Sequence, residues 1–306
     1  MSDKTVPLND TSMFSNVFSY MGLPFSRDLE DESVDAVVMG VPYDLGTSGR
    51  AGTRSGPNAI RQASANLRWE ERRWPWDFSL GSRLAVADYG DIQFMWGDSE
   101  DMLTQVEGHA ARITAAGKTL VSLGGDHFVT LPLLRGHAKT HGALSLIHFD
   151  AHTDTYDEEE KYNHGCMFYR APREGLIDPA RSIQIGIRTQ YERSTHEFEV
   201  IDAHKANEQS VAETVAAIRK RVGDTAAYLT FDIDCLDPAY APGTGTPVVG
   251  GLTTSKTLAI LQGIADLNIV GFDVVEVSPA YDHASVTALA GATLALQFLY
   301  MRASRG

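Results

Sequence analysis

The stretch Ile147-His148-Phe149-Asp150-Ala151-His152-Thr153-Asp154 places acidic and imidazole side chains directly after an apolar run. The run, Leu144-Ser-Leu-Ile147, is typical of a buried strand. Side chains alternate between faces along an extended chain, so Asp150, His152 and Asp154 are expected to project to one side. The stretch therefore predicts a polar site at the end of a buried strand.

Two other stretches repeat this arrangement. Gly124-Gly125-Asp126-His127 follows the apolar run 120–123, and Phe231-Asp232-Ile233-Asp234 ends the run 226–231. A buried carboxylate without a partner is costly, and no comparable run of Lys or Arg lies nearby in the sequence. We therefore expect a two-metal site, because four carboxylates balance the charge of two divalent cations. These carboxylates belong to Asp150, Asp154, Asp232 and Asp234.

Other polar residues near these stretches have different expected roles. His148 is expected deeper in the strand, in the core or supporting a ligand, and Asp126 is expected to anchor the backbone or a ligand. Cys235 has the opposite parity from Asp232 and Asp234 and is excluded as a ligand. The remaining histidines lack acidic neighbours at ligand spacing and are expected on the surface: His137, His141, His196 and His204.

Composition narrows the class of protein. The chain has 306 residues, a formal net charge of −14 and 43% hydrophobic residues. This charge disfavours a nucleic-acid or anionic-membrane partner and favours a cationic substrate or divalent metals. The only cysteines, Cys166 and Cys235, form no CxxC motif, so neither a disulfide scaffold nor a zinc–thiolate site is expected. We see no signal peptide and no apolar run long enough to span a bilayer, so we expect a soluble, cytoplasmic protein.

Apolar runs and helical patterns alternate along the chain. Strands are expected at 35–41, 84–87, 118–123, 144–149, 182–187, 197–201, 226–231 and 268–275. Helices are expected from Pro57 onward and at 98–116, 129–140, 208–222, 254–266 and 285–302, the last of them apolar almost all round and buried. This alternation predicts a three-layer α/β/α fold with a mainly parallel sheet of about eight strands, covered on both faces.

We expect one domain over residues 1–306. Residues 1–33 are expected to pack on that domain or on a neighbouring subunit. The loop Ser48 to Gly56 is expected near the mouth of the site, because it has glycines but not the spacing of a phosphate-binding loop. All three polar stretches fall at the carboxyl ends of strands, where ligands bind in open α/β sheets.

The polar stretches together resemble the ureohydrolase family. The matching motifs are Gly124–His127, Phe149–Asp154 and Thr230–Pro238, followed by Ala241–Pro247. The resemblance extends from about Gly40 to the last helix, and it implies the arginase-like fold. Within the family, three further stretches resemble the bacterial agmatinases: Ser48–Arg50, Leu131–Leu134 and Glu276–Tyr281.

The resemblance implies two Mn²⁺ ions and a ligand for each position. One ion would be bound by His127 and Asp154 and the other by His152 and Asp234, with Asp150 and Asp232 bridging. It also implies that hydroxide attacks a guanidinium carbon and that urea leaves when the tetrahedral intermediate collapses. By the same resemblance the protein would be a homo-oligomer, a trimer or a hexamer.

Three more residues receive roles from the resemblance. His164 matches the family's proton-handling histidine, a role that suits imidazole near neutral pH. Glu276 matches the acid that holds the guanidinium, with which a carboxylate forms a bidentate pair. Thr246 is expected to bind substrate by supporting Glu276.

The expected substrate is agmatine, which would be hydrolysed to putrescine and urea for polyamine biosynthesis. Arginase-like members carry Ser-Gly-Asn before the catalytic histidine, whereas this chain has the acidic run Asp157–Glu160, which we expect to overhang the site and favour a substrate with a positive far end. A guanidino compound with a carboxylate, such as guanidinobutyrate or arginine, remains an alternative because Arg50 and Arg54 lie near the mouth. A catalytically silent metal-binding subunit is the alternative from another class.

Overall fold

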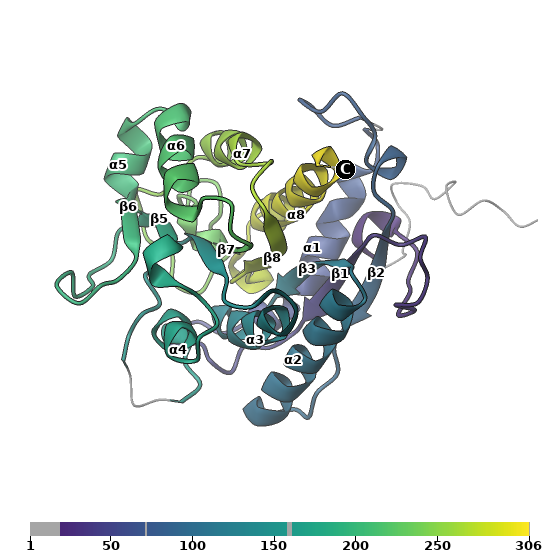
Figure 1. Ribbon diagram of the computed structural model, residues 1–306, viewed down its shortest axis with the longest axis horizontal. Helices are drawn as coiled ribbons and strands as arrows, with labels where there is room; N and C mark the ends of the chain where they lie inside the picture. Colours follow the sequence, from purple (N-terminus) through teal and green to yellow (C-terminus); the bar gives the residue numbers. More distant parts are fainter. Residues whose placement is uncertain (1–18, 71, 158–160, 306) are drawn as a thin grey trace, which may run out of the picture.

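The computed structural model describes residues 19–70, 72–157 and 161–305. An eight-stranded sheet forms its centre, with the strand order β2-β1-β3-β8-β7-β4-β5-β6 (Figure 1). Each neighbouring pair of strands in this sheet is parallel. The strands are β1 Ala36–Val41, β2 Val86–Asp91, β3 Thr119–Gly124, β4 Ser145–Phe149, β5 Ile183–Ile187, β6 Glu199–Asp202, β7 Ala227–Asp232 and β8 Ile269–Val275.

Helices cover both faces of this sheet. Figure 1 shows α2, α3 and α4 on one side and α1, α6, α7 and α8 on the other. The helices are α1 Gly56–Ser64, α2 Ser99–Ala115, α3 Thr130–His141, α4 Met167–Arg173, α5 Ala203–Glu208, α6 Val211–Val222, α7 Thr254–Gly263 and α8 Val286–Ser304. The predicted three-layer α/β/α fold with a parallel sheet is therefore confirmed.

Each inner strand contributes to two apolar layers because successive side chains point to opposite faces. Val38 and Val121 pack in the layer with α1 and α8, whereas their neighbours Val37 and Leu120 pack in the layer with α2 and α3. Burial on both faces explains why these strands are continuous apolar runs in the sequence. The two apolar layers thus hold the strands in place, and the polar loops lie at the carboxyl ends of the strands.

The last helix is buried, as its apolar sequence predicts. By length and composition alone, α8 is apolar enough to cross a membrane, with 78% of its most apolar window buried inside the protein. The sequence analysis expected no segment long and apolar enough to span a bilayer, and by length and composition that expectation is wrong. Because it packs against the sheet, α8 is a core helix.

Two short helices were not expected from the sequence. The helix α4 follows the loop that carries His164, and α5 lies directly before the region 208–222 in which one helix was expected. Ser210 separates α5 from α6 because its side chain accepts from the backbone N–H of Glu213 while the Glu213 carboxylate accepts from the N–H of Ser210.

Tyr20, in the described part of the N-terminal region, packs on the sheet and on α8. Its backbone N–H donates to Asp88 at 2.6 Å and its hydroxyl donates to the carbonyl of Ala292 at 2.7 Å. Residues 1–18 lie outside the described part of the chain, so the packing expected for them stays a prediction.

Candidate metal centre and active site

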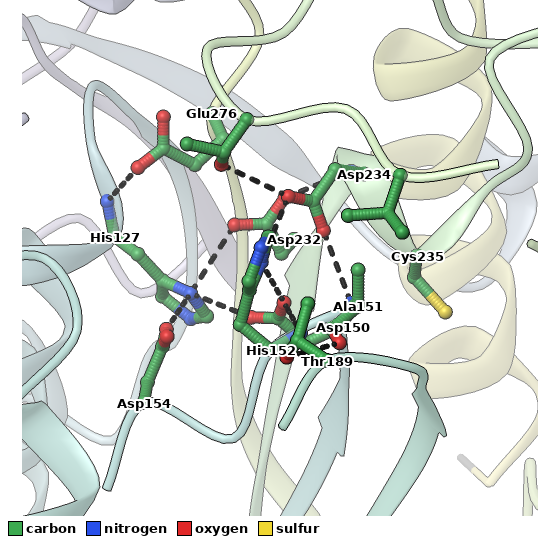
Figure 2. Close-up of polar contacts among 12 residues, drawn as sticks. His127, Asp150, Ala151, His152, Asp154, Thr189, Asp232, Asp234, Cys235 and Glu276 are labelled. Atoms are coloured by element: carbon green, nitrogen blue, oxygen red, sulfur yellow. Dashed lines mark hydrogen bonds and ion pairs between the residues drawn. The ribbon is translucent and has the colours of Figure 1, made fainter. Parts of the chain in front are cut away.

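The polar stretches meet at the carboxyl ends of four central strands (Figure 2). His127 follows β3, Asp150 follows β4, Asp232 ends β7 and Glu276 follows β8. These strands are neighbours in the order β3-β8-β7-β4, so residues far apart in the sequence come together at one edge. This is the edge at which open parallel sheets bind ligands.

The local backbone differs from the extended chain that side-chain alternation assumed. Strand β4 already ends at Phe149, and Asp154 adopts a left-handed conformation with φ 49°. Residues Ile233–Cys235 form a short 3₁₀ turn, in which Asp232 accepts a hydrogen bond from the N–H of Asp234 at 2.8 Å. The acidic side chains therefore converge through turns, and the alternation argument was wrong although it selected the same residues.

His127 faces three carboxylates. Its Nδ1 lies 2.8 Å from Asp154 Oδ2, 3.0 Å from Asp150 Oδ2 and 3.3 Å from Asp232 Oδ2. Burial opposes a charged imidazole here, but the three carboxylates outweigh burial and raise the pKa of His127 well above its ordinary value. This corner of the site attracts positive charge strongly.

His152 forms a second, more open corner. Its Nδ1 lies 3.3 Å from Asp150 Oδ1 and 3.2 Å from Asp234 Oδ2. The side chain is 20% exposed, compared with 1% for His127. Burial lowers the pKa of His152, and the charges of Asp234 and Asp150 outweigh it, raising the pKa to about 12.

Asp150 belongs to both corners. Its Oδ2 faces His127 and its Oδ1 faces His152, so one carboxylate joins two groups of metal-ligand type. These groups are His127, His148, Asp150 and Asp154, and Asp150, His152 and Asp234. Among the described residues Asp232 contacts His127 but not His152, so bridging by Asp232 stays a prediction.

The donor set fits metal ions. His127 Nδ1 is buried without a hydrogen-bond partner among the described residues, although carboxylate oxygens lie around it. Burial together with the charges of Asp234 and Asp150 raises the pKa of Asp232 well above its ordinary value, so the bare cluster repels its own charge. Imidazole and carboxylate donors without thiolate suit manganese, cobalt or iron better than structural zinc.

His148 supports a ligand. Gln184 Nε2 donates to His148 Nδ1 at 2.9 Å, so the proton of His148 lies on Nε2 and is donated to Asp150 Oδ2 at 2.8 Å. With that proton in place, Nε2 has no lone pair for a metal. Figure 2 shows the sulfur of Cys235 pointing away from the carboxylates, in keeping with its exclusion as a ligand.

Two histidines differ from the expected surface positions. His137 is fully buried in α3, where its Nδ1–H donates to the carbonyl of Leu133 at 2.8 Å. Burial lowers the pKa of His137 to about 4, which keeps it neutral. His196 is half-buried, and its Nε2 donates a hydrogen bond to Gln184 Oε1 at 2.8 Å. Gln184 in turn donates to His148, so it connects the two histidines. Placing both on the surface was wrong, because sequence spacing shows neither which face of α3 meets the sheet nor that the loop of His196 lies against Gln184.

His164 lies beside Glu276 at the mouth of the site. Its Nδ1 donates to Glu276 Oε1 at 2.8 Å, and its Nε2 accepts from the backbone N–H of Ser48 at 3.1 Å. In this arrangement Nε2 carries no proton, and its contact with the Ser48 N–H must be released before Nε2 can be protonated. Burial lowers the pKa of His164, but the charge of Glu276 outweighs it and raises the pKa to about 9. The ring is therefore placed to take up and release a proton at Nε2, next to the loop that the sequence placed near the mouth.

Glu276 is held in an unusual backbone conformation. It has φ 63°, a left-handed conformation that ordinary residues rarely adopt. Its N–H donates to the carbonyl of Gly125 at 2.8 Å, and its Oε1 also accepts from the N–H of His127 at 2.9 Å. Gly125 must lack a side chain, because a Cβ there would lie 1.7 Å from the carbonyl oxygen of Tyr43. Glu276 Oε2 is buried without a hydrogen-bond partner in the described chain, so it is free to accept from a ligand.

Thr246 lies on the metal side of the cavity. Its hydroxyl donates to Asp234 Oδ2 at 3.2 Å. No contact of Thr246 with Glu276 is found among the described residues, so the expectation that Thr246 binds substrate by supporting Glu276 stays a prediction. Arg188, which the sequence did not single out, donates to the carbonyls of Asp234 at 2.6 Å and Val248 at 2.7 Å and so ties the two loops together.

A cavity of about 190 Å³ opens over the carboxylates. Its lining includes Ser48, His152, Asp154, Tyr156, Asn163, His164, Asp232 and Thr246. Tyr156 also lines a neighbouring cavity of about 410 Å³, where Asp157 is found. Residues 158–160 of the acidic run lie outside the described residues, so the overhang expected for Asp157–Glu160 stays a prediction.

Both arginines near the mouth are engaged by the protein itself. Arg50 donates to the carbonyls of Gly245 at 3.0 Å and Thr244 at 2.6 Å, and its guanidinium lies 4.4 Å from the centre of the Tyr281 ring. Arg54 pairs with the buried carboxylate of Asp44 through a 2.5 Å hydrogen bond. Among the described residues that line the cavity, none is Lys or Arg.

Comparison with known proteins agrees with this geometry. The model of the Arginase family matches residues 34–301. A protein named agmatinase from Photorhabdus laumondii is 56% identical over 296 residues, which cover 97% of this chain and 96% of that protein. The crystal structure of a hypothetical agmatinase from Burkholderia thailandensis is 45% identical, covers 96% of this chain and 93% of its own, and superimposes with a TM-score of 0.92.

A second solved structure shows how broad the likeness is. Proclavaminate amidino hydrolase from Streptomyces clavuligerus is 36% identical with a TM-score of 0.90, and the match covers 97% of this chain and 100% of that one. The expected resemblance is thus confirmed by a family model over most of the chain and by relatives of nearly the same length. The chain belongs to the arginase family, whose members are the ureohydrolases.

Proposed function

We propose that this protein is an agmatinase that hydrolyses agmatine to putrescine and urea with two Mn²⁺ ions. The ureohydrolase fold and the His/Asp cluster provide the chemistry, and the 56% identity to proteins named agmatinase over 97% of the chain supports the substrate. One observation carries the choice of substrate most directly: no described residue lining the cavity supplies a free cation for a substrate carboxylate.

The two corners of the cluster would hold one ion each, with Asp150 between them. Divalent cations held there lower the pKa of water and so supply a nucleophile at neutral pH. Asp150, Asp154, Asp232 and Asp234 would balance the charge of both ions. His148 keeps Asp150 in place by donating from Nε2.

Glu276 and His164 would act on the substrate. The free Oε2 of Glu276 would accept from the guanidinium, whose planar N–H groups match a carboxylate. His164 would deliver a proton from Nε2 to the departing amine, since an amine leaves more readily when protonated. Ser48 and Glu276 hold the ring of His164 between them for this transfer.

The end of the substrate away from the guanidinium would distinguish agmatine from guanidinobutyrate and arginine. Agmatine carries an ammonium there, whereas guanidinobutyrate carries a carboxylate and arginine carries both groups. The engaged guanidiniums of Arg50 and Arg54 would leave a carboxylate without a cationic partner, which is costly in a partly desolvated cavity. A silent metal-binding subunit is disfavoured by the joint presence of the cluster, His164 and Glu276 in one cavity.

Urea release from Mn²⁺-loaded protein tests this proposal. The panel is agmatine, guanidinobutyrate and arginine, and Glu276→Gln is the control variant for activity that does not come from this site. We expect the highest kcat/KM with agmatine. A kcat/KM for arginine or guanidinobutyrate equal to that for agmatine would overturn the substrate assignment, and no urea from any of the three would favour the silent subunit.

We also propose a homo-oligomer of three or six copies and a cytoplasmic location. Trp74 and Trp96 are 88% and 98% exposed in the single chain, and large exposed aromatic side chains are enriched at protein interfaces. Cys235 is a buried free thiol, which is compatible with a reducing compartment. Light scattering on purified protein and fractionation of expressing cells test these two points.

A further inference from the structure

A buried carboxylate lies beneath the metal centre, three residues before Glu276 in β8. Asp273 is fully buried and accepts hydrogen bonds from three hydroxyls: Thr230 at 2.6 Å, Tyr228 at 2.8 Å and Thr130 at 2.9 Å. No ion pair to Asp273 is found in the described parts of the chain. Placing such a group in the core is costly, so its position calls for a physical reason.

One of the three hydroxyls connects Asp273 to a predicted metal ligand. Thr230 Oγ1 lies 2.9 Å from His127 Nε2. The Thr230 hydroxyl has a single proton, which it donates to Asp273 Oδ1, so its oxygen accepts from His127 Nε2–H. The proton of a neutral His127 then lies on Nε2, and its Nδ1 lone pair faces Asp150, Asp154 and Asp232.

We propose that Asp273 is a positioning residue for the metal ion on the His127 side. Through Thr230 it holds the imidazole in the tautomer and orientation in which Nδ1 can bind a cation. Groups that orient a metal-binding histidine in this way contribute to metal affinity. The inference rests on the proposed two-ion site.

The other histidine has a different environment, so the effect should be confined to one ion. His152 is partly exposed, and within the described chain the carboxylates facing its Nδ1 are those of Asp150 and Asp234. No contact of Asp273 or Thr230 with His152 occurs among the residues that the structure describes. Loss of the Asp273 carboxylate should therefore weaken one of two ions and leave the other as it was.

Asp273→Asn tests the proposal because the amide has nearly the same shape without the charge. We expect the Mn²⁺ affinity of one site to fall roughly 10–100-fold, in the range seen when such supporting groups are changed. Equilibrium dialysis at graded free Mn²⁺ should show two ions per chain for the native protein and one for Asp273→Asn at low Mn²⁺. The electron paramagnetic resonance signal should change from a coupled pair to a single ion, and excess Mn²⁺ should restore urea release.

A matched pair of variants separates this role from general support of the core. Thr230→Val breaks the link to His127, whereas Thr130→Val removes a donor on the other oxygen of Asp273 and leaves the link in place. We expect the Thr230→Val variant to lose the same ion as Asp273→Asn, and the double variant to be no worse than either alone. Thr130→Val should keep both ions at close to native affinity.

Three outcomes would overturn the inference. Asp273→Asn or Thr230→Val could bind both ions with native affinity, or Thr130→Val could weaken binding as much as Thr230→Val. If Asp273→Asn does not fold, the two threonine variants decide alone. A native protein that never binds two Mn²⁺ ions would instead contradict the proposed function, and that result is read from the native protein before any variant.

Discussion

The two sides of the metal centre are built differently. On the His127 side the imidazole is 1% exposed and is held from behind by Thr230 and Asp273. On the His152 side the imidazole is 20% exposed, and the residue belongs to a loop, where the backbone N–H of His152 donates to Asp150 Oδ1 at 2.6 Å. The difference indicates a rigid inner half and a more accessible outer half, and His152 of the outer half lines the cavity over the carboxylates.

Loss of Asp150, the ligand that both sides share, should have the largest effect because it should weaken both ions. Asp150→Ala removes the carboxylate that both sides use, so we expect both ions to bind poorly and urea release to fall below detection. Asp154→Ala removes a carboxylate on the His127 side only, so this variant should retain the ion on the His152 side. Metal content after dialysis, with urea release from agmatine, measures both variants. Retention of one tightly bound ion by Asp150→Ala would show that the sides do not share it.

His164→Ala should lower turnover while leaving both sides of the metal centre filled. We expect a roughly 10²–10⁴-fold decrease in kcat, the usual contribution of a general acid or base. Ser48→Ala is the matched control, because it removes the hydroxyl at 2.9 Å from His164 Nε2 but keeps the backbone N–H contact. An unchanged kcat in His164→Ala with normal metal content would remove His164 from the mechanism.

Removal of the metals should lower stability because the carboxylates then repel one another. A ligand present at 100 to 1,000 times its Kd stabilises the native state by about 3 to 4 kcal/mol per site. We expect chelation to lower the melting temperature and Mn²⁺ to restore it, in two steps if the inner and outer halves differ in affinity. Calorimetric scans at graded Mn²⁺ measure this, and a melting temperature independent of Mn²⁺ would contradict a metal centre here.

The metal-free protein should also depend on pH through His164. Its pKa of about 9 in the folded protein lies above the ordinary 6.5. The contribution of its charged form to stability is therefore fully present below pH 6.5 and is lost as the pH rises through about 9. The difference in unfolding free energy between native protein and His164→Asn should reach at most about 3 kcal/mol at pH 6 and shrink by pH 9.5. Denaturant unfolding at both pH values checks this, and an equal difference at both would contradict it.

Thr246→Val should have the smallest effect and sharpen the contrast between the two sides. It removes one hydrogen bond to Asp234, a ligand on the outer side, at a cost of about 1 kcal/mol. We expect a few-fold weaker binding of one ion, and that ion should differ from the ion lost in Thr230→Val. Metal titrations of the two valine variants compare them directly. If both variants weaken the same ion, the division into inner and outer halves is wrong.

Much of the fold follows from the sequence because the strands are buried on both faces. Apolar runs such as 119–124 and 269–275 stand out from the polar helices between them, and every expected strand is present within a few residues. The short helices α4 and α5 were missed because they have too few turns to show an apolar stripe. The start of α6 after Ser210 was missed although Ser210 and Glu213 have the spacing of a capping box, which is a signal that the sequence does carry.

The site could be foreseen less completely. The clustered carboxylates were found because acidic residues directly after apolar runs are unusual. Their convergence depends on the left-handed backbone conformation of Asp154 and Glu276, and no pattern of side chains in the sequence predicts that conformation. Asp273 and Thr230 were missed for the opposite reason, since each is a single polar residue inside an apolar run. Their role depends on contacts between β7 and β8 that only the folded sheet reveals.

The strand order has a consequence for protein synthesis. Strand β8 is the last of the sheet to leave the ribosome, yet it lies between β3 and β7 in the middle of the sheet. Until it is made, the strands β2-β1-β3 and β7-β4-β5-β6 are two separate groups, each with an open edge that can pair with another chain. His127 belongs to the first group and the clustered aspartates to the second. A nascent chain therefore holds every ligand early but cannot close the metal centre until β8, with Glu276 at its end, joins the two groups.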